Sequence, residues 1–221
     1  LERCAEHGGW SGLLIDLRGN PGGYMDAVID VASLFIKRGP LLFTVGRDGK
    51  ENAIEIRDGS SVPVPVALLV DEGSASASEV FAGAMQDYSL AKLVGARTYG
   101  KGSVQQLVAL ETGGGLRVTV EHYLTPRRRP VNGIGIAPDT EARRPLEAPM
   151  AALREIEAKG AFRVEMKAYE TVVNGFAFND VVPVVRENGK VYVSSRALAA
   201  IIGGEASWDG AAGAVAIEGK L

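Results

Sequence analysis

The sequence predicts an α/β protein followed by a small α+β domain, and three observations support this. From the start to about residue 145, apolar runs of strand length alternate with helical patterns. The run Pro65–Asp71, PVALLVD, is apolar almost throughout, which is typical of a strand buried on both faces. Beyond about residue 163 the runs become short, and Asn188 followed by Gly189 between two of them predicts a hairpin.

The first part, 1–145, should contain a strand, a helix, several further strands and a second helix, in that order. The amphipathic stretch 24–38 and the stretch 78–88 have helical patterns. Gly113–Gly115 is typical of a hairpin turn between the last two strands. The strands are expected at 12–17, 41–45, 53–57, 65–71, 91–95, 103–110 and 116–124.

A linker and a tail should follow. The stretch EAPMAALREIEAKG, 147–160, has helical composition and ends at Gly160, a natural helix stop. We therefore predict a linker helix within 146–162 and a second domain over 163–221. That domain should combine strands near 171–178 and 205–219 with the hairpin and a helix over 195–204.

Composition excludes several classes of function. The chain has 221 residues, 46% of them hydrophobic, which is enough for one sizeable core or two smaller ones. A net charge of -3 gives no broad basic field, so no nucleic-acid partner is predicted, and Arg127–Arg129 is interpreted as a solvated turn. Cys4 has no second cysteine to pair with, and His7 and His122 cannot assemble a metal site. Neither a metal nor a cofactor is expected.

The chain contains no run of 18 apolar residues, so no membrane span is predicted. It starts without methionine, and LERCAEHGGW is interpreted as the end of a helix that leads into the first strand. We expect the sequence to be a piece of a longer protein.

The stretch GARTYGKGS, 95–103, has the glycine and lysine spacing of a phosphate-binding loop. Such a loop needs Ser or Thr after its lysine and a helix behind it. Here Gly102 follows Lys101, and the next segment is rich in β-branched residues, so it is a strand. The nucleotide interpretation is therefore disfavoured, which leaves an exposed turn lysine or a lysine with a chemical role.

A possible partner for this lysine lies in GSASASEVF, where the buried strand gives way to a helix. Ser76 and Glu79 fit a capping box, so Ser76 could be a helix cap. It could also be a nucleophile, because unpaired amides at a helix start can stabilise an oxyanion. A lysine can act as its base if burial lowers the lysine pKa from roughly 10.4. Neither histidine lies in a local signature of a catalytic base.

Four ordered motifs carry a resemblance to a known family. LLIDLRGNPGG, GSASASEVFAGAMQD, LVGARTYGKGSVQ and HYLTPRRRPVNGIGIAPD resemble the carboxyl-terminal processing, or tail-specific, proteases over about residues 12–139. The resemblance implies a partial crotonase/ClpP-like protease core. It also implies a serine endopeptidase that works outside the cytoplasm and cleaves protein or peptide substrates near their C-termini through an acyl-enzyme.

The resemblance also assigns residues. It implies Ser76 as nucleophile, Lys101 as general base and Gln105 as the residue that positions the lysine. The oxyanion donors would be the amide of Ala77 and that of Gly22 or Gly23. Three further positions that matter in the family can equally be explained by support of the fold: Glu79, Asp87 and Thr98.

The sequence departs from the family in two ways. The family has a peptide-binding PDZ module and further core segments before the point where this sequence starts. Its usual TPSGR appears here as TPRRR, without the glycine, so that turn is expected to differ.

The tail, from about 164 to 218, is similar to the stalk-type domain named after the N-terminus of copper amine oxidases, but without visible copper ligands. We interpret it as a spacer or binding module. Two alternatives stay open: a non-catalytic fragment that acts as a scaffold in protein binding, and assembly as a homo-oligomer.

Overall fold

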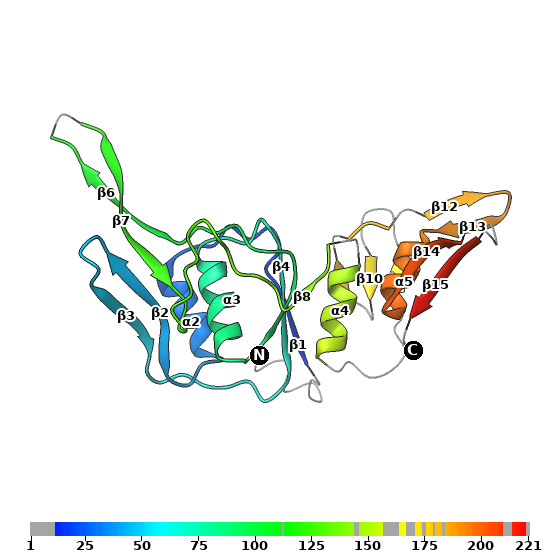
Figure 1. The fold of residues 1–221 in the computed structure, drawn as a ribbon, viewed down its shortest axis with the longest axis horizontal. Helices are drawn as coiled ribbons and strands as arrows, with labels where there is room; N and C mark the ends of the chain where they lie inside the picture. Colours follow the sequence, from blue (N-terminus) through cyan, green and yellow to red (C-terminus); the bar gives the residue numbers. More distant parts are fainter. Residues whose placement is uncertain are drawn as a thin grey trace.

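The computed structural model describes residues 12–111, 113–143, 146–156, 164–166, 171–173, 176–178, 180–182, 184–209 and 214–219. Two sheets with helices between them form one side of the molecule, and a tail of short strands forms the other (Figure 1). Two expected features lie outside the described residues: the N-terminal helix end with Cys4 and His7, and the last residues of the expected linker, 157–162.

A parallel sheet forms the centre of the first part, in the order β1-β4-β5-β8. Its strands are Leu13–Asp16, Val66–Val70, Lys92–Gly95 and Thr140–Glu141, and each adjacent pair is parallel. All residues of β4 are buried, which confirms the sequence prediction for this strand. Because the strands are parallel, the loops that follow β1, β4 and β5 leave from the same edge.

An antiparallel sheet in the order β3-β2-β7-β6 stands opposite. Its strands are Glu51–Ile56, Gly39–Gly46, Gly115–Leu124 and Ser103–Ala109. Helices α2, Met25–Ser33, and α3, Ala77–Asp87, lie between the two sheets (Figure 1). Helix α2 ends at Ser33, earlier than the predicted residue 38, and the carbonyls of Ser33 and Leu34 accept hydrogen bonds from Ser60.

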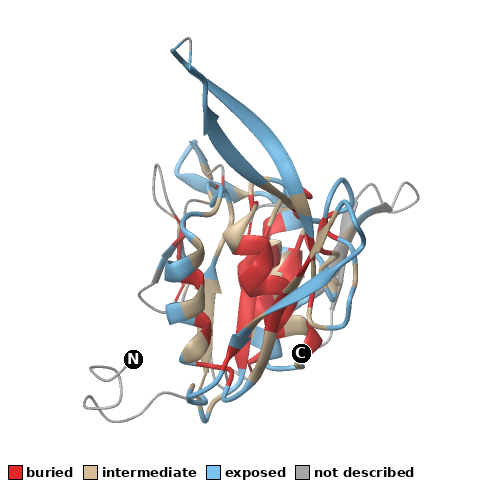
Figure 2. Cartoon of the chain, turned by 90° about the vertical axis from the view of Figure 1, so that its left-hand side faces the viewer, coloured by how far each residue is buried: buried red, intermediate tan, exposed pale blue. Residues whose placement is uncertain are grey.

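Strand β4 belongs to two hydrophobic clusters, one on each face. Val66, Leu68 and Val70 pack with α2, α3 and the antiparallel sheet. Ala67 and Leu69 point the other way and pack against α4, Glu147–Glu155. The alternation follows from the period of two along a strand. Figure 2 shows the buried residues gathered in the middle of the first part.

The tail strands form sheets of their own. β10, Thr171–Val173, pairs with β9, Val164–Met166, and with β11, Phe176–Phe178. The predicted hairpin at Asn188 and Gly189 is present, as β12, Val184–Glu187, and β13, Lys190–Val193. The remaining elements are α5, Ser195–Ile202, β14, Gly204–Asp209, and β15, Ala214–Gly219.

Helix α4 connects the tail to the first part. Its buried Met150 belongs to the cluster on the outer face of β4, and the same cluster includes Val173, Phe178 and Ala197 of the tail. The tail therefore packs against the first part through α4. The boundaries at 145/146 and 162/163 stay predictions.

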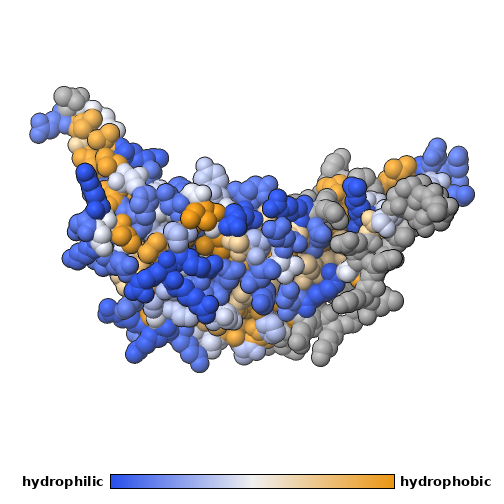
Figure 3. Space-filling model, viewed as in Figure 1, coloured by the Kyte–Doolittle hydropathy of each residue, from blue (hydrophilic) through white to orange (hydrophobic). Residues whose placement is uncertain are grey.

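The β6–β7 hairpin extends away from the body of the protein (Figures 1 and 2). Apolar side chains lie exposed along it, as the orange arm in Figure 3 shows. They are Leu107, Val108, Leu110, Leu116, Val118 and Val120. Val108 and Leu116 are directly opposite each other, so they share one face.

The TPRRR turn keeps a left-handed residue without a glycine. Arg128 has φ 58, a conformation that glycine adopts at no steric cost. Its guanidinium bonds Glu51 at 3.0 Å and lies 4.1 Å from the ring centre of Phe43. Arg129 pairs with the buried carboxylate of Asp87. Two arginines of this run thus have structural partners, whereas the sequence indicated only a solvated turn.

Among the described residues, no helix has both the length and the apolar character needed to cross a membrane.

Met150→Ala should lower the free energy of unfolding by about 3 kcal/mol, the usual scale for emptying a fully buried site. The cavity would lie between β4 and the tail, so both should be weakened. Urea unfolding measures the loss. Leu198→Ala on α5, where the side chain is 42% exposed, is the control and should cost less than about 1 kcal/mol. Equal losses in the two variants would contradict the packing described for α4.

Candidate active site

Ser76 lies where β4 leads into α3. The turn 71–76 joins them, and Ser76 is the N-cap residue with φ 57 and ψ -117. It forms the capping box with Glu79 that the sequence indicated. An N-cap residue normally has β-region dihedrals, so capping does not account for this conformation. Such backbone strain costs about 1–3 kcal/mol and clusters at active sites.

The glycine turn that follows β1, residues 19–23, packs directly against Ser76. A Cβ on Gly22 would lie 2.6 Å from the Ala75 carbonyl oxygen, 2.7 Å from the Ala77 amide nitrogen and 2.9 Å from the Ser76 Cβ. Only glycine allows this approach, and its φ of 95 also requires glycine. The structure thus brings together Gly22, Ser76 and Ala77, three of the residues that the sequence analysis selected.

Asn20 forms hydrogen bonds between that turn and residues 74–78, which we call the serine segment. Its carbonyl accepts hydrogen bonds from the Ala75 amide at 3.0 Å and the Ser78 hydroxyl at 3.1 Å. Its side-chain oxygen accepts the Gly22 amide at 2.9 Å. The Gly22 amide is therefore already engaged, whereas the Gly23 amide has no hydrogen-bond partner among the described residues.

The carboxylate of Glu79 joins the serine segment to residues 98–102, which we call the lysine loop. Glu79 is fully buried. One oxygen accepts the Ser76 amide at 2.9 Å and the Lys101 amide at 2.8 Å. The other accepts the Thr98 hydroxyl at 2.5 Å and the Gly100 amide at 2.7 Å. All four neighbours donate, which suits an acceptor-only carboxylate. The backbones of Ser76 and Lys101 are thus held by the same oxygen atom.

The VNGIGI segment, 131–136, holds the lysine loop from the other side. The Ile136 amide donates to the Thr98 hydroxyl at 2.7 Å, and the Gly133 amide donates to the Gly100 carbonyl at 2.8 Å. A Cβ on Gly102 would lie 2.3 Å from the Asn132 amide nitrogen. The glycines of both segments therefore allow two backbones to touch, and the loop is fixed on both sides.

Tyr123 reaches the serine from β7. Its hydroxyl donates to the Ser76 carbonyl at 3.2 Å, and its ring is buried. Burial raises the pKa of Tyr123 well above its usual value, and the charge of Glu79 raises it further. The phenol therefore stays protonated and acts as a donor at physiological pH.

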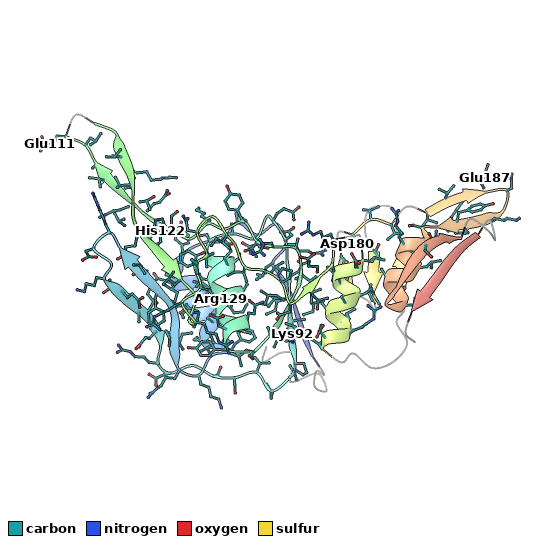
Figure 4. The ribbon with its side chains drawn as sticks, viewed as in Figure 1. Lys92, Glu111, His122, Arg129, Asp180 and Glu187 are labelled. Atoms are coloured by element: carbon teal, nitrogen blue, oxygen red, sulfur yellow. The ribbon has the colours of Figure 1, made fainter. Side chains whose placement is uncertain are left out.

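The side chains of Lys101 and Gln105 are exposed. The described residues thus do not supply the burial that the sequence analysis expected for a lysine base. The Gln105 side chain is directed to β7, where its amide lies 3.5 Å from the Thr119 hydroxyl, and it makes no hydrogen bond to Lys101 among the described residues. His122 is exposed on β7 (Figure 4).

Sequence reasoning missed much of the support around these residues. It left Glu79, Asp87 and Thr98 open between fold support and chemistry, with Ser76 as the one partner named for Glu79, and it did not select Asn20 or Tyr123. The capping-box spacing was a usable signal for Glu79. Nothing in the local sequence indicates that this carboxylate also binds a loop about 20 residues later.

The comparisons with known proteins show which family the first part resembles. The sequence profile of Peptidase family S41 matches residues 2–142. A carboxyl-terminal-processing protease of Synechocystis is 41% identical over 141 residues, which cover 64% of this chain and 33% of the relative. The chloroplastic carboxyl-terminal-processing peptidase 3 of Arabidopsis thaliana is 45% identical over 130 residues, 58% of this chain and 25% of the relative. The chain therefore spans about a third or less of the length of these relatives.

Solved structures show the same core. The photosystem II D1 C-terminal processing protease matches with a TM-score of 0.60 and 38% identity, over 64% of this chain and 36% of that protein. A lipoprotein from Streptococcus agalactiae also has a TM-score of 0.60, at 19% identity, over 71% of this chain and 57% of its own, so it shows the fold alone.

Glu79→Gln should lower the free energy of unfolding by about 3 kcal/mol or more, because an amide nitrogen would face two donors that the carboxylate oxygen now accepts. Thermal and urea unfolding measure this. Glu72→Gln, on the exposed part of the same 71–76 turn, is the control and should change stability by less than about 0.5 kcal/mol. A Glu79→Gln protein as stable as the control would show that the carboxylate does not join the two segments.

Proposed function

The chain belongs to peptidase family S41, and from this premise we propose that it carries the catalytic centre of a serine endopeptidase that processes proteins near their C-termini. One observation supports this most. The strained N-cap residue of α3 is a serine, and both the Gly22 backbone and the Ala77 amide lie against it. Backbone strain clusters at active sites, and amides at a helix start can stabilise an oxyanion, so this arrangement suits a nucleophile with an oxyanion site.

In the proposed reaction, the Ser76 hydroxyl attacks the scissile carbonyl and Lys101, as the free amine, accepts the hydroxyl proton. The tetrahedral intermediate collapses to an acyl-enzyme as the amine leaves with a proton from Lys101. Water then attacks the ester and releases Ser76, with Lys101 again as base. Gln105 is proposed to orient the lysine when substrate is bound.

The amides of Ala77 and Gly23 are the proposed oxyanion donors. Ala77 begins α3, so its amide has no partner within the helix and lies at the positive end of the helix dipole. Of the two candidate glycines, Gly23 is preferred because the Gly22 amide already donates to Asn20. Gly22 instead brings the turn close enough to Ser76.

The exposure of Lys101 leads to a further part of the proposal. A lysine base must lose its ammonium proton, which is easier once water is removed. In this chain that removal requires a cover over Lys101, and an extended substrate chain lying across Ser76 would provide it.

The tail, 163–221, is proposed to be the stalk-type module on the basis of its resemblance to that domain. The protein is proposed to work outside the cytoplasm, again on the basis of family resemblance.

A fluorophosphonate probe should label Ser76, and Ser76→Ala should abolish labelling. Lys101→Ala and Lys101→Arg should both reduce it to background, since a guanidinium stays protonated below about pH 12 and cannot act as the base. Active-site labelling followed by mass spectrometry measures both effects.

His122→Ala is the control, because a Ser/His mechanism would place the loss there. An unlabelled wild-type chain would support a non-catalytic scaffold, and substantial labelling of Lys101→Arg would exclude the lysine as base.

Gly22→Ala should also reduce labelling by at least about tenfold, because the added methyl group would overlap the Ala75 carbonyl and push the turn away from Ser76. Gly19→Ala in the same turn is the matched control: its φ of 65 is also left-handed, but nothing lies within 4 Å of the added Cβ. Equal effects would indicate that left-handed strain, and not contact with the serine segment, explains the loss.

A further inference from the structure

Arg18 links the glycine turn to the tail. Its guanidinium makes hydrogen bonds to two carboxylates. Nε donates to the two oxygens of Asp16 at 2.9 Å and 3.2 Å, and Nη2 donates to Asp16 at 2.7 Å. Nη1 donates to both oxygens of Asp180 at 3.1 Å and 3.0 Å. The side chains of Arg18 and Asp180 are only 20% and 11% exposed. Water therefore screens this pair less than an ordinary surface ion pair.

Asp180 is itself fixed within the tail. Its carbonyl accepts the Thr171 hydroxyl at 2.5 Å, and its carboxylate accepts the Leu146 amide at 3.4 Å. Thr171 is fully buried, and Val182 beyond Asp180 belongs to the cluster around α4. Figure 4 shows Asp180 between the first part and the tail strands. The carboxylate thus reaches Arg18 from a packed position.

Arg18 immediately precedes the turn that contacts the proposed nucleophile. Next to it, the Leu17 carbonyl accepts the Ser74 hydroxyl at 2.8 Å. Two residues later, Asn20 accepts the Ala75 amide and the Ser78 hydroxyl. The same segment is also held within the first part, where the Leu17 amide donates to the Leu69 carbonyl at 2.9 Å and the Gly19 amide donates to the Asp71 carboxylate at 2.8 Å. The Arg18 guanidinium adds the hydrogen bonds that tie this segment to the tail.

Desolvation lowers the pKa of Arg18, but the hydrogen bonds and charges of Asp16 and Asp180 raise it above its usual value overall. The guanidinium is therefore permanently charged. Without Asp180 it would keep Asp16, its near neighbour in sequence, and lose its contact with the tail.

We infer that Asp180 is a positioning residue for the serine centre: through Arg18 it sets the glycine turn against Ser76, so that the tail completes the site and is not only a spacer. This inference rests on the proposed function for its effect on chemistry. A shift of about 1 Å in catalytic groups can cost 100-fold in rate, so a small movement of the turn is sufficient.

A polar contact between α4 and the tail, separate from the Arg18–Asp180 pair, allows a matched control. The Arg154 guanidinium donates to the carbonyls of Ala200 and Ile201 in α5 at 2.7 Å and 2.8 Å. This contact fastens the tail but does not involve Arg18. If Asp180 only holds the tail in place, loss of either contact should have the same effect on the serine.

The test compares Asp180→Asn, Asp180→Glu and Arg154→Met with the wild-type chain. One readout is the maximal rate of Ser76 labelling by a fluorophosphonate at saturating probe. The other is hydrogen exchange of the backbone amides of residues 17–23. Asp180→Asn should slow labelling by at least about tenfold and speed exchange, and Asp180→Glu should restore part of both.

Arg154→Met should stay within about twofold of wild type in both readouts. In the Arg18→Gln background, Asp180→Asn should have no further effect, since the two act as one unit. Circular dichroism checks that each variant is folded.

Equal slowing by Arg154→Met and Asp180→Asn, or unchanged labelling and exchange in folded Asp180→Asn, would overturn the inference. An unlabelled wild type would overturn the proposed function instead, and hydrogen exchange would still show whether Asp180 holds the turn.

Discussion

The buried carboxylate of Glu79 is the interaction on which the site depends. It accepts hydrogen bonds from the serine segment and from the lysine loop, which are separated by more than 20 residues and by strand β5. Burying a carboxylate is unfavourable unless several donors surround it. Those donors are backbone amides and a threonine hydroxyl, so the carboxylate is stable only when both segments have their native conformation. The two segments and the carboxylate therefore order each other.

The parallel sheet explains why these segments meet at all. The glycine turn follows β1, the serine turn follows β4, and the lysine loop follows β5. In a parallel sheet these ends share one edge, which is where open α/β sheets place their sites. Strand β4 is buried on both faces, by α3 on one side and α4 on the other. The serine therefore follows a strand that is buried on both faces, and the glycine turn and the lysine loop follow the two strands beside it.

The sequence was informative where a pattern is local. The apolar run of β4, the small-residue start of α3 and the hairpin at Asn188 and Gly189 were all predicted, and ordered motifs identified the family. Contacts between distant segments were not predictable. No local pattern indicates that Glu79 binds Gly100, that Lys101 is exposed, or that Arg128 adopts the conformation usual for glycine. Each depends on which backbone passes nearby, and that is decided by tertiary packing.

The glycine turn and the serine segment are held in different ways, and the difference bears on the tail. The serine segment is fixed from within the first part, by Glu79, Tyr123 and the start of α3. The glycine turn has hydrogen bonds to that segment through Asn20 and to Asp71 through the Gly19 amide, and Arg18 at its beginning adds a link to the tail. A glycine-rich turn has little side-chain packing of its own, so its position depends on such anchors. Of the residues that hold the glycine turn, Asp180 belongs to the tail and acts through Arg18. If Asp180 positions this turn as we infer, the site is complete only when the tail is docked, and the apolar cluster around α4 then supports the geometry of the site as well as stability.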